Sequence, residues 1–134
     1  MPEHRFTFLF DRPFDPSFIY RDNVQGEVLW PQARHPLLYH VWFEWAIPHY
    51  LRKAKADLYF SPEGYLPLSS SIPRINVIHD INFEHHPEWV DAAHRWHFRK
   101  YFPRYAAAAD KVITVSEFSK QDIIKTYGTS AEKI

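Results

Sequence analysis

The chain has 134 residues, with 16 Lys and Arg against 16 Asp and Glu and a formal net charge of zero, so a strongly basic nucleic-acid binder is excluded. Hydrophobic residues make up 46% and charged residues 24%, which is typical of one globular domain and excludes a disordered chain. Cysteine is absent, so disulfides, thiolate nucleophiles and cysteine-based metal sites are excluded. No apolar run approaches the roughly 18 residues of a spanning helix, and we expect a cytoplasmic protein.

The first part of the chain predicts two strands followed by a helix. Residues 5–10 form a short apolar and aromatic run, and residues 24–30 alternate in polarity before a proline, so both are typical of strands. From residue 37, apolar side chains recur every third or fourth position. This spacing predicts a helix over residues 37–54, kinked at Pro48.

The middle of the chain predicts two strands joined by a long irregular segment. Residues 58–60 and 75–78 are short continuous apolar runs of the kind that parallel sheets bury on both faces. Residues 61–73 are rich in proline and serine and predict a loop. A second long helix is expected over residues 90–109, with a bend at Pro103.

The last part of the chain predicts a buried strand over residues 111–115 and a helix over residues 117–127. Ser116 is well placed to cap the start of that helix, and Gly128 to end it. The alternation of strands and helices along the chain predicts an α/β fold with a mainly parallel sheet.

Ligands of parallel α/β sheets bind beyond the carboxyl ends of the strands. This rule identifies the polar residues that follow each expected strand as candidates for one common cleft. They are Asp11, Arg12, Gln32, Arg34, His35, Glu63, residues 79–86, Ser116 and Ser119.

The densest group of reactive side chains follows the expected strand over residues 75–78. His79 and Asp80 come first, and His85 and His86 follow. A neutral imidazole beside a carboxylate suits acid and base chemistry, recognition of sugar hydroxyls or metal binding. Two alternatives remain open, a structural loop in which Asp80 only caps a turn, and a metal site built from these four residues.

The segment 116–119 opens a helix whose free N–H groups could hold an anion, although ordinary capping by Ser116 explains the same residues. The chain has only three glycines, so a phosphate-binding Walker loop, a dinucleotide fingerprint and a serine-hydrolase elbow are excluded. The helix over residues 90–109 mixes tryptophan with arginine and lysine. Such a helix can lie on an anionic membrane, or it can pack one face on the sheet and leave the other in solvent.

Three segments together resemble a known family. They are residues 56–62 (ADLYFSP), residues 77–87 (VIHDINFEHHP) and residues 109–120 (ADKVITVSEFSK). Their order and spacing are similar to those of the N-terminal domain of family 4 (group 1) glycosyltransferases, and the resemblance covers nearly the whole chain. It implies a GT-B fold, in which two Rossmann-like domains face each other, and a retaining transferase that needs no metal or other cofactor.

The resemblance also implies roles for individual residues. His79 would lie near the donor sugar and its leaving phosphate, where it positions substrate and stabilises charge, and Asp80 would orient it or contact substrate. Arg34, His35 and Glu63 follow strands at the same edge of the expected sheet, and from that position we expect them to contact the acceptor, a glycan or a lipid-linked sugar. Ser116 and Ser119 are expected to bind substrate from the same edge. The nucleotide-sugar would be held mainly by a C-terminal domain, and the protein would be cytoplasmic, with possible peripheral contact at the inner membrane face.

The chain departs from the family pattern at both ends. The family places a strand, a glycine-containing loop and a helix before a strand like residues 5–10, and it continues into a second domain after a segment like residues 132–134. We therefore expect residues 1–134 to be a partial N-terminal domain that is inactive by itself, with two groups of strands lacking their shared central neighbour. The alternative is a non-catalytic α/β module that binds a sugar or a protein.

Overall fold

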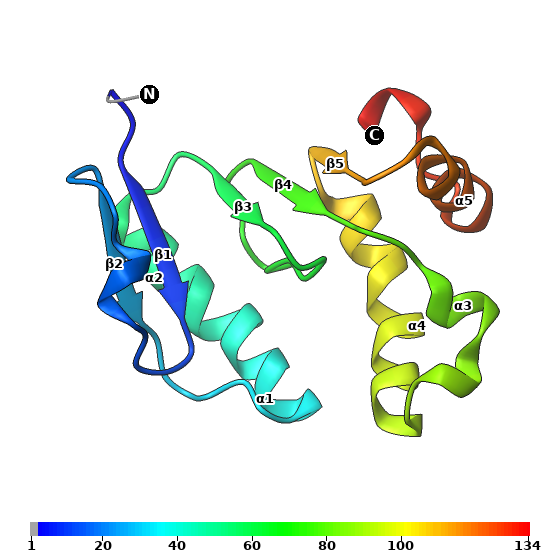
Figure 1. Ribbon diagram of the computed structural model, residues 1–134, viewed down its shortest axis with the longest axis horizontal. Helices are drawn as coiled ribbons and strands as arrows, with labels where there is room; N and C mark the ends of the chain where they lie inside the picture. Colours follow the sequence, from blue (N-terminus) through cyan, green and yellow to red (C-terminus); the bar gives the residue numbers. More distant parts are fainter. Residues whose placement is uncertain (1–2) are drawn as a thin grey trace.

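The computed structural model describes residues 3–134, so the first two residues of the expected domain lie outside the described residues. Within residues 3–134, five strands form two separate sheets, and all their pairings are parallel. The α-helices lie between strands in sequence, apart from α5 after the last strand, and lie beside them in space (Figure 1). The predicted α/β class with parallel strands is confirmed, and it is consistent with part of a Rossmann-like domain.

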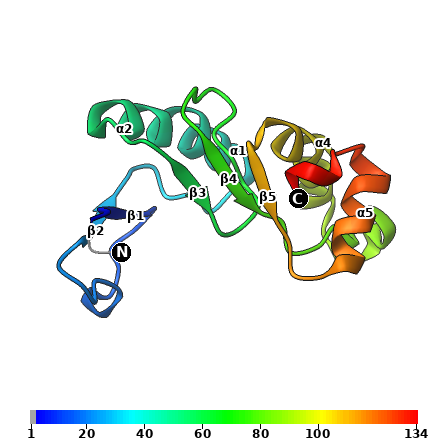
Figure 2. The same cartoon turned by 90° about the horizontal axis from the view of Figure 1, so that it is seen from above.

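The first sheet consists of β1 (Phe6–Phe10) and β2 (Val24–Val28), which are in register from the pair Phe6 and Val24 to the pair Phe10 and Val28. A short 3-10 helix, η1 (Pro16–Phe18), lies in the connection between them. The strand β2 is two residues shorter than the strand predicted over residues 24–30. This pair is not hydrogen-bonded to the second sheet, and Figure 2 shows the two sheets apart.

The helix expected over residues 37–54 is divided into α1 (Pro36–Val41), the π-helical turn η2 (Trp42–Ala46) and α2 (Ile47–Ala54). Pro48 explains the irregularity, because proline has no N–H to donate to the carbonyl of Glu44 four residues earlier. The hydroxyl of Ser69 donates to that carbonyl at 3.0 Å. The irregular turn thus connects the helix to the loop over residues 62–73.

The second sheet has the order β3 (Tyr59–Ser61), β4 (Arg74–Val77) and β5 (Lys111–Ile113). Between β4 and β5 the chain forms a short helix α3 (Asn82–His85), the 3-10 turn η3 (Pro87–Trp89) and the long helix α4 (Ala92–Ala108). The helix α5 (Glu117–Tyr127) and the 3-10 turn η4 (Ala131–Lys133) follow β5. The short helix α3 was not predicted, whereas the limits of α4 and α5 agree with those of the expected helices to within two residues.

The main hydrophobic core lies between the second sheet and the helices α4 and α5. Phe102, Tyr105 and Ala106 of α4 pack with Ile78 after β4 and with Val112 of β5. A smaller core joins the first sheet to the turn η2 and the helix α2, where the indole of Trp42 donates to the carbonyl of Leu29 at 3.0 Å. These two cores hold the loops that follow β3 and β4 next to each other.

Only one face of the second sheet is covered by helices. The helices α2 and α4 lie on the same side of β3, β4 and β5 (Figure 2), and on that side Ser61, Asn76 and Val112 are buried. On the other side Phe60 is 52% exposed and Ile113 is 47% exposed. The prediction that these apolar runs are buried on both faces is therefore wrong for the described part of the chain, because residues 3–134 supply no second layer of helices.

None of the helices within residues 3–134 combines the length and the apolar character that crossing a membrane requires.

Candidate functional site

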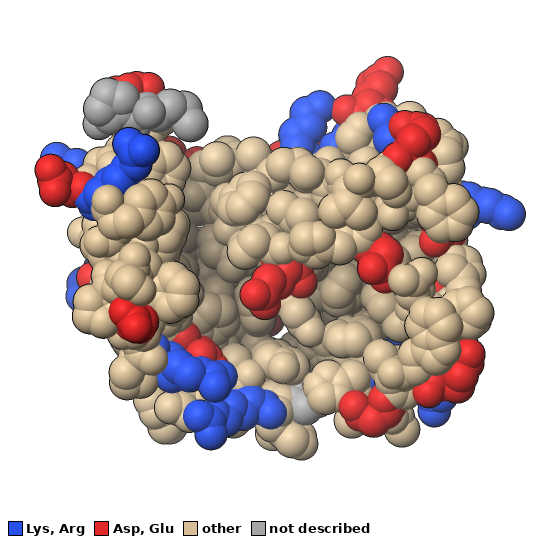
Figure 3. All heavy atoms as spheres, in the orientation of Figure 1, with Lys and Arg blue, Asp and Glu red and all other residues tan. Residues whose placement is uncertain are grey.

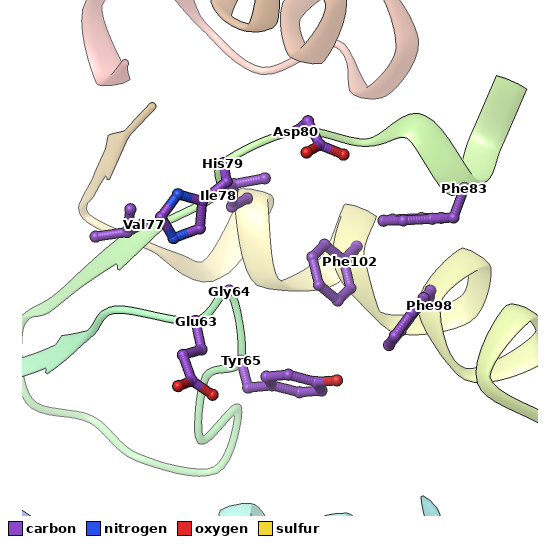
Figure 4. A pocket seen from close by; sticks show the side chains of 10 residues that line it. All are labelled: Glu63, Gly64, Tyr65, Val77, Ile78, His79, Asp80, Phe83, Phe98 and Phe102. Carbon is purple, nitrogen blue, oxygen red and sulfur yellow. The ribbon is translucent and has the colours of Figure 1, made fainter. Parts of the chain in front are cut away.

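The carboxyl end of β4 opens into a cavity of about 220 Å³. Glu63, Gly64 and Tyr65 of the loop after β3 line one part of it, and His79 and Asp80 line another. Figure 4 shows these side chains together with the aromatic rings of the remaining wall. The remaining lining residues are Val77, Ile78, Phe83, Phe98 and Phe102. The cavity therefore combines an apolar aromatic wall with a few polar groups, as small-molecule sites do.

His79 is the first residue after the buried Ile78, and its ring is exposed. The ring atom Nε2 lies 3.0 Å from the carbonyl oxygen of Pro62 in the loop after β3. The backbone carbonyl of His79 accepts a hydrogen bond from the hydroxyl of Thr114, the residue after β5, at 3.2 Å. Two neighbouring strand ends thus hold the position of His79, as the rule for parallel sheets predicts.

Asp80 is also exposed, and one carboxylate oxygen accepts a hydrogen bond from the backbone N–H of Asn82 at 3.0 Å. This contact caps the turn that leads into α3, as the structural alternative for Asp80 requires. Within residues 3–134 the second oxygen, Oδ2, makes no hydrogen bond. One oxygen therefore maintains the backbone turn, and the other is free to meet a ligand.

The opposite part of the cavity carries Glu63 and Tyr65. In Figure 4 the carboxylate of Glu63 lies on the side of Tyr65, away from the ring of His79. Burial raises the pKa of Tyr65, with smaller contributions from Tyr39 and Glu63, so the phenol stays protonated. On the face of the molecule drawn in Figure 3, the charged side chains around the hollowed centre are mostly acidic, and Lys and Arg lie towards the edge.

The remaining candidates after β2 do not line this cavity. His35 caps α1, since its Nδ1 atom accepts a hydrogen bond from the N–H of Leu37 at 3.3 Å. Arg34 is exposed in the same loop. Asp11 anchors the loop, because its carboxylate accepts hydrogen bonds from the guanidinium of Arg12 and the N–H of Ala33. The bond from Arg12 is the main reason that the pKa of Asp11 lies below its usual value.

The serines at the start of α5 satisfy each other and lie outside the cavity lining. The hydroxyl of Ser116 accepts from the N–H of Ser119 at 3.1 Å and donates to the hydroxyl of Ser119 at 3.1 Å. Ser119 is buried, at 7% exposed. These contacts are those of an ordinary helix cap, so the substrate-binding role of Ser116 and Ser119 stays a prediction.

The histidines of α3 have partners away from the cavity. His85 lies 2.8 and 2.9 Å from the two carboxylate oxygens of Asp122 on α5, and His86 contacts Glu88 and stacks on the ring of Trp89. In the described part of the chain no group of three or more His, Cys, Asp or Glu side chains could hold a metal ion. The metal alternative built from residues 79–86 therefore finds no support in the arrangement of these side chains.

The sequence did not identify the apolar wall of the cavity as part of a site. Phe98 and Phe102 belong to the helix expected over residues 90–109, and Phe83 belongs to the candidate segment 79–86, but none of them was singled out as a site residue. Gly64 has a φ angle of +85°, and a Cβ atom added there would lie 2.9 Å from the ring of Phe102. A glycine inside a proline-rich and serine-rich loop was the only signal that the backbone approaches another element closely at this point.

Gly64→Ala is expected to lower the free energy of unfolding by about 3 kcal/mol. The left-handed backbone costs about 1 kcal/mol for alanine, and overlap with Phe102 adds about 2 kcal/mol. Gly128→Ala is the matched control, because Gly128 has a φ angle of +68° but no atom within 4 Å of an added Cβ. Urea denaturation of both variants measures the difference. Equal losses would show that Phe102 does not restrict Gly64.

A family model described as Glycosyltransferase Family 4 matches residues 3–134, which is the whole described chain. Comparison with curated proteins and comparison with solved structures give no match.

Proposed function

The chain belongs to glycosyltransferase family 4, and from this premise we propose that it is the acceptor-side part of the N-terminal domain of a retaining hexosyltransferase. The enzyme transfers a sugar from a nucleotide-sugar to a glycan or a lipid-linked acceptor, in the synthesis of a polysaccharide or related glycan. The donor nucleotide is held mainly by a C-terminal domain of the complete enzyme. The sugar then meets the acceptor at the cavity after β4.

The observation that supports this function best is the position of His79 and Asp80 at the carboxyl end of β4, on the wall of the cavity. An imidazole nitrogen and a free carboxylate oxygen are good partners for sugar hydroxyls. Aromatic rings such as Tyr65 and Phe98 provide the apolar surface on which the C–H face of a sugar packs. His79 therefore positions the sugar and stabilises charge at the reacting carbon, and no covalent bond to His79 is required.

The acceptor approaches from the loops that follow β2 and β3. Glu63 lines the cavity and contacts acceptor hydroxyls, while Arg34 and His35 extend the acceptor site beyond the cavity. Ser116 and Ser119 bind substrate from the start of α5, at the same edge of the sheet.

A lipid-linked acceptor places this cytoplasmic enzyme at the inner membrane surface. The exposed side of α4 suits such peripheral contact, because α4 carries four Lys and Arg residues and no Asp or Glu. Arg95, Trp96, Arg99 and Lys100 lie together around one shallow groove there. Cationic and tryptophan side chains are favoured at the interface of anionic membranes.

The direct test is a transfer assay with the complete enzyme, nucleotide-sugar donors and sugar acceptors, with NMR analysis of the product. We expect the new glycosidic bond to have the same anomeric configuration as the donor. An inverted product would contradict the retaining mechanism. Binding of sugars with no transfer from any donor would favour a non-catalytic module.

Glu63→Gln is expected to raise the acceptor KM about tenfold and to leave the donor KM within a factor of two, since one charged hydrogen bond to a hydroxyl contributes about 1.5 kcal/mol. Glu27→Gln on β2 is the matched control, because Glu27 is exposed and lies outside the cavity. Steady-state kinetics with each substrate varied in turn separate the two constants. A larger change in the donor KM would remove Glu63 from the acceptor side.

A further inference from the structure

We propose that the loop over residues 62–73 determines which ring nitrogen of His79 carries the proton. In this arrangement the carbonyl of Pro62 holds the proton on Nε2, so that Nδ1 is the atom that accepts a hydrogen bond from the ligand. Glu44 and Asn76 are the positioning residues that keep this loop in place. The consequence for catalysis rests on the proposed function, whereas the proton position can be measured without it.

The direction of the hydrogen bond between His79 and Pro62 follows from its chemistry. Nε2 lies 3.0 Å from the carbonyl oxygen, which is an ordinary length for a hydrogen bond from nitrogen to oxygen. A carbonyl oxygen can only accept, so Nε2 must donate. In the neutral ring the proton is then on Nε2 and Nδ1 is bare. Within residues 3–134 Nδ1 makes no hydrogen bond, which leaves its lone pair for a ligand.

Asn76 anchors the loop close to Pro62. Its side-chain amide is completely buried in β4 and donates to the carbonyl of Gly64 at 3.0 Å. Gly64 follows Pro62 by two residues, and its left-handed backbone turns the chain beside Phe102. The position of the Pro62 carbonyl therefore depends on a buried bond from the same strand that carries His79 at its end.

Glu44 anchors the far part of the same loop from the π-helical turn η2. Its carboxylate accepts hydrogen bonds from the N–H groups of Leu68 at 2.8 Å and Ser69 at 2.9 Å. Its backbone carbonyl accepts the hydroxyl of Ser69 at 3.0 Å. Three hydrogen bonds to one residue hold the loop against the helix, and Pro48 leaves that carbonyl available. The turn η2 thus influences the site through the loop, without contacting the ligand itself.

The proton position is measured by NMR of the ring nitrogens in the complete enzyme labelled with 15N-histidine. His79→Gln assigns the signals. His49 is the internal reference, because it is exposed on α2 and makes no hydrogen bond within the described residues. We expect the neutral ring of His79 to show a single Nε2–H form with a ring proton that exchanges slowly. His49 should show a mixture of the two neutral ring forms. A mixture at His79 like that of His49, or a proton on Nδ1, would overturn the proposal.

The positioning role is tested with Glu44→Gln. This variant keeps the size of the side chain but places an N–H group against the backbone N–H of Leu68 or Ser69. We expect faster exchange of the His79 ring proton by about tenfold and a kcat about tenfold lower with little change in either KM. Glu27→Gln should change none of these. Asn76→Leu gives a second test, because it removes the bond to Gly64 and keeps a branched side chain. An unchanged His79 ring signal in both variants would overturn the positioning role.

The two proposals fail in different ways. A single Nε2–H form at His79 in a protein that transfers no sugar would leave the inference intact and contradict the proposed function. An active transferase in which His79 samples both forms freely would contradict the inference alone.

Discussion

Replacing His79 by alanine in the complete enzyme is expected to lower kcat/KM about 100-fold or more without unfolding the domain. The reason is that removal of one positioned polar group at a reacting centre costs about 3 kcal/mol of transition-state stabilisation. The side chain is exposed and its contact with the protein is one hydrogen bond to Pro62. The loss of stability should therefore stay within about 1 kcal/mol.

Initial rates with both substrates varied, together with circular dichroism, check this expectation. His49→Ala is the matched control, since it removes an exposed histidine of α2 that lies outside the cavity. Turnover by His79→Ala equal to that of the His49 variant would remove His79 from the reaction and leave Asp80 as a cap of the turn before α3.

The second large effect concerns His97, which is only 1% exposed between α4 and α1. Neither ring nitrogen makes a hydrogen bond within residues 3–134. Burial, with smaller contributions from the nearby imidazoles of His40 and His94, lowers the pKa of His97 to about 4. Its ring contacts include Tyr39, Tyr65 and Tyr101, and within residues 3–134 no Asp or Glu forms an ion pair with it.

The unfolded chain binds the proton of His97 more tightly than the folded chain does. The folded state therefore loses stability as pH falls below about 6.5, until His97 is protonated in both states near pH 4. A difference of about 2.5 units corresponds to about 3 kcal/mol in total, of which about 2 kcal/mol is lost by pH 5. His40 adds to this loss, since burial also lowers its pKa. The carboxylates Asp11 and Asp91, whose pKa values are lowered by hydrogen bonds, act only at lower pH.

His97→Phe should make the protein at least as stable at pH 7.5, because it removes two buried polar atoms without partners, and it should reduce the loss between pH 7.5 and pH 5 by about 2 kcal/mol. Urea unfolding followed by tryptophan fluorescence at both pH values measures this. The matched control is His49→Phe, an exposed histidine whose replacement should leave the pH dependence unchanged. If His97→Phe loses as much stability between pH 7.5 and pH 5 as the wild type, His97 is not held in its neutral form in the folded protein.

Local signals in the sequence were sufficient for most of the secondary structure. Ser116 caps α5 and Gly128 ends it in the left-handed conformation, so both limits of that helix were predicted correctly. Pro48 indicated a disturbance of the first helix, but not that it would be a π-helical turn. Caps and prolines act on backbone atoms within about four residues, and such effects can be read from the sequence.

The candidate site was predicted in part. The rule that ligands bind at the carboxyl ends of parallel strands selected Glu63, His79 and Asp80, which line one cavity in the structure. It did not separate them from Arg34, His35, Ser116 and Ser119, which follow other strand ends and lie outside the lining. That separation depends on the direction in which each loop leaves its strand, and contacts between distant residues decide it.

The α/β class, the helices α4 and α5, and the segment that carries the reactive side chains follow from the sequence alone, because periodicity, caps and motifs are local. The role of each histidine depends on tertiary contacts. His79 is exposed at a strand end, His85 binds Asp122, and His97 is buried among aromatic rings. Their identical side chains differ only in solvent access and in partners from remote segments. Those partners are brought together by packing of the sheet and helices, which no short stretch of sequence encodes.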